Sequence, residues 1–128
     1  MRTIAALALA LLLALAPVNG ARAQFVMDVL SLVAAIQVGD LTGAVEGVSD
    51  ANRVYVARVT ELSGIRQNGR RLTRVIEQRR GVLRYFRYAI QGAREAMKAL
   101  ETHGESLDDV IFATYTNDRT ATLYVDDR

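Results

Sequence analysis

The chain contains no cysteine, and among its 128 residues there is one histidine and one proline. No disulfide, cysteine zinc site, thiolate nucleophile or lipid-carrying cysteine is therefore available. With His103 as the sole histidine, a multi-histidine metal site is excluded, and any catalytic triad would have to use that residue. The sole proline is Pro17, so no later residue forces a helix to break.

Catalytic signatures are also missing. No serine lies in a G-x-S-x-G turn, and there is no phosphate-binding glycine pattern and no EF-hand spacing. The pairs Asp108-Asp109 and Asp126-Asp127 could bind a hard cation weakly, but solvated strand ends explain them more simply. His103, directly before Gly104, is explained as a helix end. We therefore expect a non-enzymatic protein without metal or cofactor.

The first 23 residues have the pattern of a secretory signal peptide. Arg2 precedes an apolar run from residue 4 to residue 16, residues 17–20 break it, and Ala21-Arg22-Ala23 has the A-x-A form of a cleavage site. The apolar run is 13 residues long, whereas a membrane-spanning helix needs roughly 20. We therefore predict a periplasmic or secreted protein with no stable membrane anchor after cleavage.

The mature chain would have 105 residues, the size of one domain with one core. Because Arg2 and Arg22 would leave with the leader, the 16 basic residues fall to 14, equal to the 14 acidic ones. Net charge therefore gives no basis for general attraction to nucleic acid or anionic membranes, and we do not expect a nucleic-acid role.

The strongest helical pattern runs from Leu72 to Leu100. Apolar residues recur there in steps of three and four, with Arg79 occupying one position of the face. The pattern predicts one long helix or two helices nearly end to end, with Gly92 as the favoured break and His103-Gly104 as the stop. The face is expected to pack on a sheet or, alternatively, to form a helix-mediated homodimer.

Residues 24–52 are predicted to form an N-terminal helix followed by a flexible linker. Helical spacing of apolar residues from Phe25 to Val38 indicates the helix, although a disordered start or a surface-seeking membrane helix also fits. Gly39 to Asn52 is rich in glycine and small residues, which offer little to bury, and therefore predicts the linker.

Three β-strands are predicted in residues 53–128. Arg53 to Leu62 is rich in β-branched and aromatic residues and favours a strand, with a helix as the alternative. Val110 to Tyr115 and Thr120 to Val125 predict a β-hairpin whose turn contains Asn117 and Asp118. In its second strand, alternation predicts one buried face and one exposed face, the latter with Thr120, Thr122 and Tyr124.

Together these elements predict an α+β fold, a small antiparallel sheet of about three strands packed on the long helix. From Val54 to Val125, this order of strand, arginine-bearing helix and closing hairpin loosely resembles that of small exported bacterial proteins of unknown function. The resemblance implies no activity.

Charge is segregated along the chain. Nine arginines lie between Arg66 and Arg94, against one acid, Glu77. At 100° per residue Arg80, Arg84 and Arg87 form a stripe beside the apolar face, with Tyr88 beyond it. Guanidinium groups beside an aromatic ring can bind phosphates or carboxylates. Alternatively, the stripe pairs with the protein's own acids at positions 108, 109, 126 and 127.

We therefore expect an interaction or structural module of the bacterial cell envelope that forms a homodimer or binds an acidic envelope partner. The alternative is a small-ligand or polyanion-binding protein that uses Arg80, Arg84, Arg87 and Tyr88.

Overall fold

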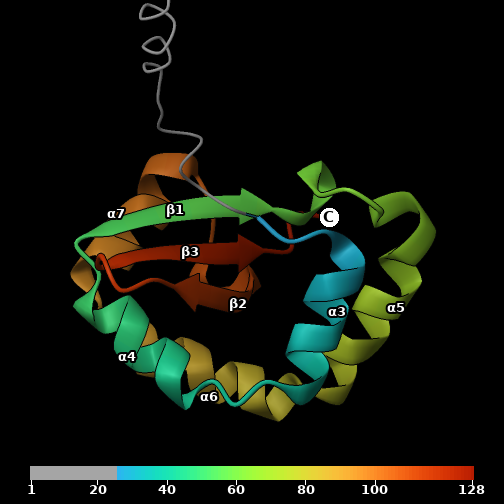
Figure 1. Cartoon of the computed structure of the whole chain (residues 1–128), viewed down its shortest axis with the longest axis horizontal. Coiled ribbons are helices and arrows are strands. Elements are labelled where there is room, and N and C mark those ends of the chain that lie inside the picture. Colours follow the sequence, from blue (N-terminus) through green and yellow to red (C-terminus); the bar gives the residue numbers. More distant parts are fainter. Residues whose placement is uncertain (1–25) are drawn as a thin grey trace, which may run out of the picture.

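The computed structural model describes residues 26–128 (Figure 1). The signal peptide predicted for residues 1–23, together with Gln24 and Phe25, lies outside the described residues. Two short 3-10 turns, η2 (Val59–Glu61) and η3 (Leu107–Asp109), accompany five helices and three strands in this range. These are α3 (Val29–Val38), α4 (Thr42–Asp50), β1 (Arg53–Arg58), α5 (Ile65–Gln78), α6 (Arg80–Ile90), α7 (Arg94–His103), β2 (Val110–Tyr115) and β3 (Thr120–Val125).

The three strands form one mixed sheet in the order β1-β3-β2. The hairpin is confirmed with the predicted strand bounds, and β2 pairs with β3 antiparallel. β1 joins β3 in parallel, with Arg53 opposite Thr120 and Arg58 opposite Val125. The α+β fold is therefore confirmed, but the sheet is not all antiparallel, because the chain crosses over through three helices before it returns to the sheet.

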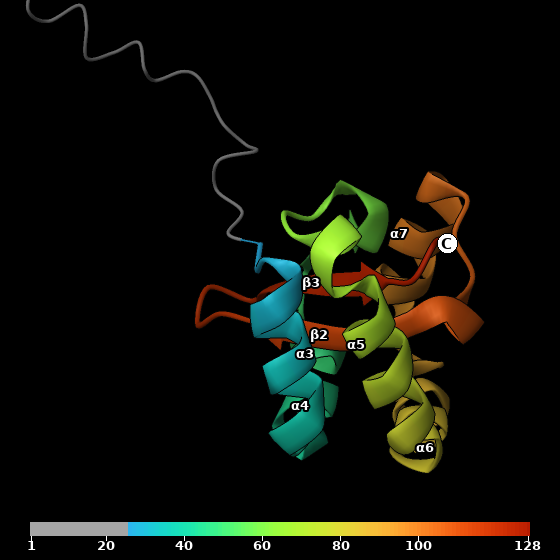
Figure 2. The same cartoon turned by 90° about the vertical axis from the view of Figure 1, so that its right-hand side faces the viewer.

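Helices cover both faces of the sheet (Figures 1 and 2). One core cluster joins the sheet to α4, α6 and α7 and includes Phe86, Ile90 and Leu123. The other joins the sheet to α3 and α5, and to α6 through Leu83, and it includes Leu32 and Leu72. The sheet is therefore the middle of three layers, with helices on each side, and β3 is its central strand.

The prediction that one face of β3 is exposed is therefore wrong. Thr122 is 6% exposed and Tyr124 is fully buried. The Tyr124 hydroxyl accepts a hydrogen bond from the Met27 backbone N–H at 3.0 Å, just before α3 begins. Period-two alternation predicted one buried face because it could not show that a second group of helices covers the other.

The N-terminal helix is confirmed from Val29 to Val38, and it packs in the core rather than remaining disordered. Its start is fixed by Asp28, whose side chain accepts a hydrogen bond from the Ser31 backbone N–H at 2.8 Å. Val29, Leu32 and Ile36 are buried against α5 and the sheet. Hydrophobic burial therefore orders this segment.

The predicted linker from Gly39 to Asn52 is wrong, because most of it is helix α4. Its glycines serve close packing: a Cβ on Gly47 would lie 2.2 Å from Cγ of Tyr115, and one on Gly43 would lie 2.9 Å from the Tyr115 hydroxyl. The Tyr115 ring thus lies against α4 where side chains are absent. The composition that indicated a linker instead allows a strand residue to approach a helix.

The predicted long helix is divided into three. The first break is at Arg79, whose φ of −107° and ψ of 20° are not helical, and the second precedes α7, where Ala93 has ψ of 105°. α5 buries Leu72 and Val75 in one core cluster, which Leu83 near the start of α6 also joins, whereas Phe86 and Ile90 further along α6 belong to the other cluster. The apolar pattern therefore passes from one face of the sheet to the other after the break at Arg79.

Among residues 26–128 no single helix is long and apolar enough to cross a membrane. α3 and α4 pass a test of length and composition only as a pair, and they are bent by 114°.

Candidate functional site

The predicted stripe lies on α6, and its residues have different surroundings. Arg80 pairs with Glu77 one turn away. Arg84 has neither a salt bridge nor a side-chain hydrogen bond to another residue among 26–128. Tyr88 is 74% exposed. These three remain on the outer surface of the helix.

Arg87 serves the fold. Its Nε donates to the Val110 carbonyl at 2.8 Å, which ties α6 to the start of β2. Burial lowers the pKa of Arg87 from its ordinary value, and the negative charges of Asp108 and Asp109 oppose that shift. This hydrogen bond and partial burial hold the Arg87 guanidinium against the start of β2, so it is less available to a partner than the exposed Arg84. The stripe is therefore reduced to Arg80, Arg84 and Tyr88.

The alternative of internal pairing with the four aspartates is not found in the described part of the chain. Asp126 pairs with Arg128, and Asp127 accepts hydrogen bonds from the backbone and hydroxyl of Thr60. Asp109 lies close enough to Arg87 to influence its pKa, but no salt bridge within 4.0 Å joins them. The positive charge of Arg80 and Arg84 is not neutralised by these acids.

Two further residues of α6 belong to the same surface. Tyr85 is 71% exposed and Val82 is 38% exposed. Tyr85 and Tyr88 are three residues apart, so they lie on neighbouring turns of the helix. Leu83, Phe86 and Ile90 are the buried residues of α6, and helical spacing from them places Tyr85 on the outer side. We define the α6 surface as Arg80, Val82, Arg84, Tyr85 and Tyr88.

Gly81 also lies beside this surface, and no close contact within the described residues requires a glycine there. A Cβ on Gly81 would have no atom within 4 Å. Gly81 is the second residue of α6, where glycine costs at most the roughly 1 kcal/mol relative to alanine that it costs in a helix interior. Gly81 precedes Tyr85 by one turn, so it leaves the backbone open for close approach from outside.

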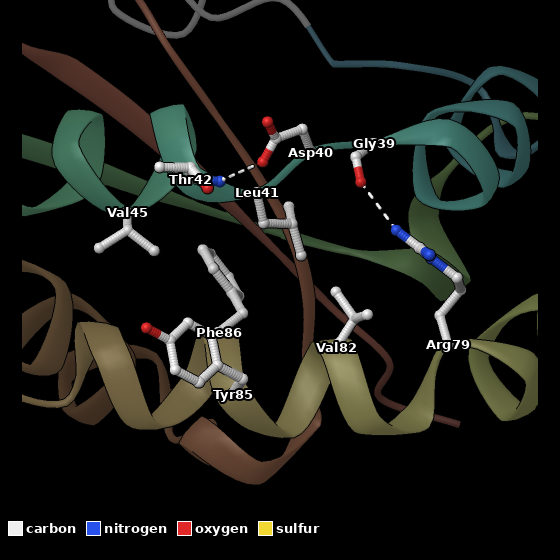
Figure 3. Close-up of a pocket in the computed structure, with 9 residues that line it drawn as sticks. All are labelled: Gly39, Asp40, Leu41, Thr42, Val45, Arg79, Val82, Tyr85 and Phe86. Atoms are coloured by element: carbon white, nitrogen blue, oxygen red, sulfur yellow. Dashed lines mark hydrogen bonds between the residues drawn. The ribbon is translucent and has the colours of Figure 1, made fainter.

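An apolar hollow of about 270 Å³ adjoins the α6 surface (Figure 3). Leu41 and Val45 contribute from the start of α4, and Val82, Tyr85 and Phe86 contribute from α6. Its polar lining residues are engaged locally. The Asp40 carboxylate accepts from the Thr42 backbone N–H at 3.0 Å, and this hydrogen bond holds the pKa of Asp40 below its ordinary value.

Arg79 closes one end of this hollow. Its Nε donates to the Ile36 carbonyl at 3.1 Å, and its terminal nitrogen donates to the Gly39 carbonyl at 2.8 Å (Figure 3). These carbonyls lie at the C-terminus of α3, where a helix leaves acceptors unpaired and where positive charge is favourable. Arg79 thus joins the end of α3 to the break between α5 and α6.

We expect Arg79→Met to lower the free energy of unfolding by about 1–3 kcal/mol, because it keeps an apolar stem but leaves both carbonyls without their donor. Arg74→Met is the matched control on α5, because Arg74 is exposed and its change should stay within about 0.5 kcal/mol. Urea denaturation followed by circular dichroism measures both. Equal stability of the two variants would contradict the structural role of Arg79.

His103 fits the predicted helix end. Its Nδ1 lies 2.9 Å from the Ala99 carbonyl of its own helix, and Gly104 follows with φ of 69°. The ring borders an open hollow with Glu95, Lys98 and Arg53. No group of three or more histidines and acids within residues 26–128 is placed to hold a metal ion.

Neither protein-family models, nor curated proteins, nor solved structures gave a match to this chain.

Proposed function

We propose that this chain is an exported, non-enzymatic interaction domain of the cell envelope, and that its α6 surface binds an acidic partner protein. The observation that carries the proposal is the exposure of Tyr85 and Tyr88, at 71% and 74%, beside Arg84, which has no carboxylate partner among residues 26–128. Tyrosine and arginine are enriched at protein interfaces and among the residues that dominate binding energy.

The chemistry of the surface favours a partner with both acidic and apolar side chains. Arg84 offers a planar guanidinium that can hold a carboxylate through two hydrogen bonds. The tyrosine rings offer rigid apolar area, and the hollow beside Tyr85 can accept an apolar side chain. A partner with acidic groups alone would leave the rings and the hollow unused.

Export is supported by the leader pattern of residues 1–23. Recovery of a chain that begins at Gln24 from the periplasm or medium, shown by N-terminal sequencing, would support this part of the proposal. A chain that keeps residues 1–23 in the cytoplasm would contradict it.

A direct test of the α6 surface uses two fluorescent acidic polymers of equal length, poly-L-glutamate and a glutamate–tyrosine copolymer, with fluorescence anisotropy as the readout. We expect the copolymer to bind more tightly. Tyr85→Ser with Tyr88→Ser should weaken copolymer binding by about tenfold or more, because it removes the apolar anchors without changing the charge. Binding of poly-L-glutamate should change little.

Charge-matched variants separate the site from general electrostatics. Arg80→Gln with Arg84→Gln should weaken binding of both polymers. Arg53→Gln with Lys98→Gln should not, because Arg53 lies at the start of β1 and Lys98 lies on α7. If both pairs weaken binding equally, or if dextran sulfate binds as tightly as the copolymer and ignores the tyrosine changes, the acidic-protein proposal fails. A dimer in light scattering that dissociates on the tyrosine changes would instead assign the surface to self-association.

A further inference from the structure

A basic hollow lies between α3 and α5, separate from the apolar hollow beside the α6 surface. It has a volume of about 280 Å³, and Val33 and Val75 line its apolar part. Its polar lining comes from Gln37 of α3 and from three residues of α5, Arg71, Arg74 and Gln78. Figure 2 shows the two helices side by side on this side of the molecule.

Helical spacing gathers these side chains. Arg71, Arg74 and Gln78 are separated by three and four residues, so they follow one side of α5. Val33 and Gln37 are four residues apart and follow one side of α3. Packing of Leu32 and Ile36 of α3 in one cluster with the buried residues of α5 turns these two sides toward one hollow.

The four polar heads have no partner in the described part of the chain. None of them has a side-chain hydrogen bond or a salt bridge to another residue among 26–128. Residues 1–25 contain no aspartate or glutamate, so they cannot supply a carboxylate side chain. The acid on α5, Glu77, pairs with Arg80 instead.

This arrangement is unfavourable for the helix by itself. Arg66, Arg70 and Arg74 follow one another at intervals of four residues, and like charges at that spacing each cost a few tenths of a kcal/mol, about 0.2–0.5. The hollow lies near the C-termini of α3 and α5, where the negative end of the helix dipole favours the positive charge of the arginines and opposes a bound anion. An anion there would therefore have to be held by the arginine and glutamine side chains themselves. The carbonyls of Ile36 and Gly39 at the end of α3 already accept hydrogen bonds from Arg79, so they do not engage Arg71 or Arg74.

We propose that the hollow between α3 and α5 is a binding site for a phosphate-type oxyanion, held by Arg71 and Arg74 with help from the amides of Gln37 and Gln78. Two guanidinium groups and two amide NH₂ groups give four separate donor groups, which suit the several oxygens of a phosphate better than the two of a carboxylate. The volume equals that of roughly nine water molecules. It therefore has room for a phosphate ester as well as for the free ion.

The test is a titration with inorganic phosphate, glycerol phosphate and acetate at constant ionic strength, followed by NMR of the arginine Nε–H and glutamine NH₂ signals. Both phosphates should shift the signals of Gln37, Gln78, Arg71 and Arg74, with a dissociation constant of roughly 1 mM. Acetate should bind more weakly. If acetate binds as tightly as phosphate, or if the shifts occur elsewhere, the assignment is wrong.

Variants of equal charge test the site itself. Arg71→Gln with Arg74→Gln should weaken phosphate binding by about tenfold or more. Arg66→Gln with Arg70→Gln removes the same charge from α5 outside the hollow and should have little effect. If both pairs of substitutions weaken phosphate binding equally, the assignment of the site is wrong. Thermal melting of each variant shows whether its fold is retained.

The source of the phosphate is distinguished by vesicles. Phosphatidylglycerol vesicles that bind the protein only when Arg71 and Arg74 are present would assign the site to a lipid headgroup. Tight binding of glycerol phosphate without such vesicle binding would assign it to a soluble ester. The α6 variants keep all four lining groups, so failure at the α6 surface and failure at this site are measured separately.

Discussion

Phe86→Ala is expected to lower the free energy of unfolding by about 3–5 kcal/mol. Phe86 is fully buried in the cluster that joins α4, α6 and α7 to the sheet, and it also forms part of the wall of the hollow beside Tyr85. Its truncation removes apolar contacts and leaves a cavity that the neighbouring strands cannot fill without moving. Urea denaturation followed by circular dichroism measures the loss.

Such a loss is a large part of the stability of a small domain, about 5–15 kcal/mol in total. Phe86→Leu therefore provides a milder variant in case the alanine variant fails to fold, and it should remain folded with a smaller loss.

Tyr85→Ala is the matched control, because this neighbouring aromatic residue is 71% exposed. Its effect on stability should stay within about 0.5 kcal/mol, whereas binding of the glutamate–tyrosine copolymer should weaken. A similar loss of stability at both positions would contradict the assignment of the two faces of α6.

Gly47→Ala is expected to destabilise the protein by about 1–3 kcal/mol, although alanine is the better helix former. The new Cβ would lie 2.2 Å from Cγ and 2.7 Å from Cβ of Tyr115. A change of the Tyr115 rotamer would move Cγ but not Cβ, whose position is fixed by the backbone of β2, so the 2.7 Å overlap would remain. Either α4 or the strand has to move, which disturbs the core on that face of the sheet.

Gly81→Ala is the opposing control. Its Cβ would meet no atom within 4 Å, so only helix propensity changes, and we expect a gain of up to about 1 kcal/mol. In a double-mutant cycle, Tyr115→Ala should cost less in the Gly47→Ala protein than in the wild type. Additive effects, or a stabilising Gly47→Ala, would mean that the ring does not pack on Gly47. Thermal melting of the four proteins of the cycle and of the Gly81→Ala variant measures these differences.

Local patterns in the sequence predicted several elements well. Alternating β-branched and aromatic residues predicted the bounds of both hairpin strands. Apolar spacing from Phe25 to Val38 predicted the N-terminal helix, which begins at Val29 after its cap Asp28. The strand predicted for Arg53 to Leu62 ends earlier, at Arg58, where a 3-10 turn follows. These elements depend on neighbours within a few residues, which a sequence displays directly.

The candidate site was predicted only in part. Helical spacing placed Arg84 and Tyr88 on the surface of α6, where they lie. It could not show that Arg87 reaches the Val110 carbonyl, because that contact joins residues 23 positions apart. The apolar hollow beside Tyr85 was also missed, since its two walls come from α4 and α6.

By itself, the sequence determined the type and approximate limits of most elements, the α+β fold and the absence of cysteine chemistry, because these follow from local periodicity and composition. Only the tertiary structure decided where the helical pattern from Leu72 to Leu100 divides and why Gly39 to Asn52 is not a linker. Arg79 breaks the helix to reach carbonyls some 40 residues away, and Gly47 makes room for Tyr115. Both depend on contacts between distant segments, which exist only once both faces of the sheet are covered.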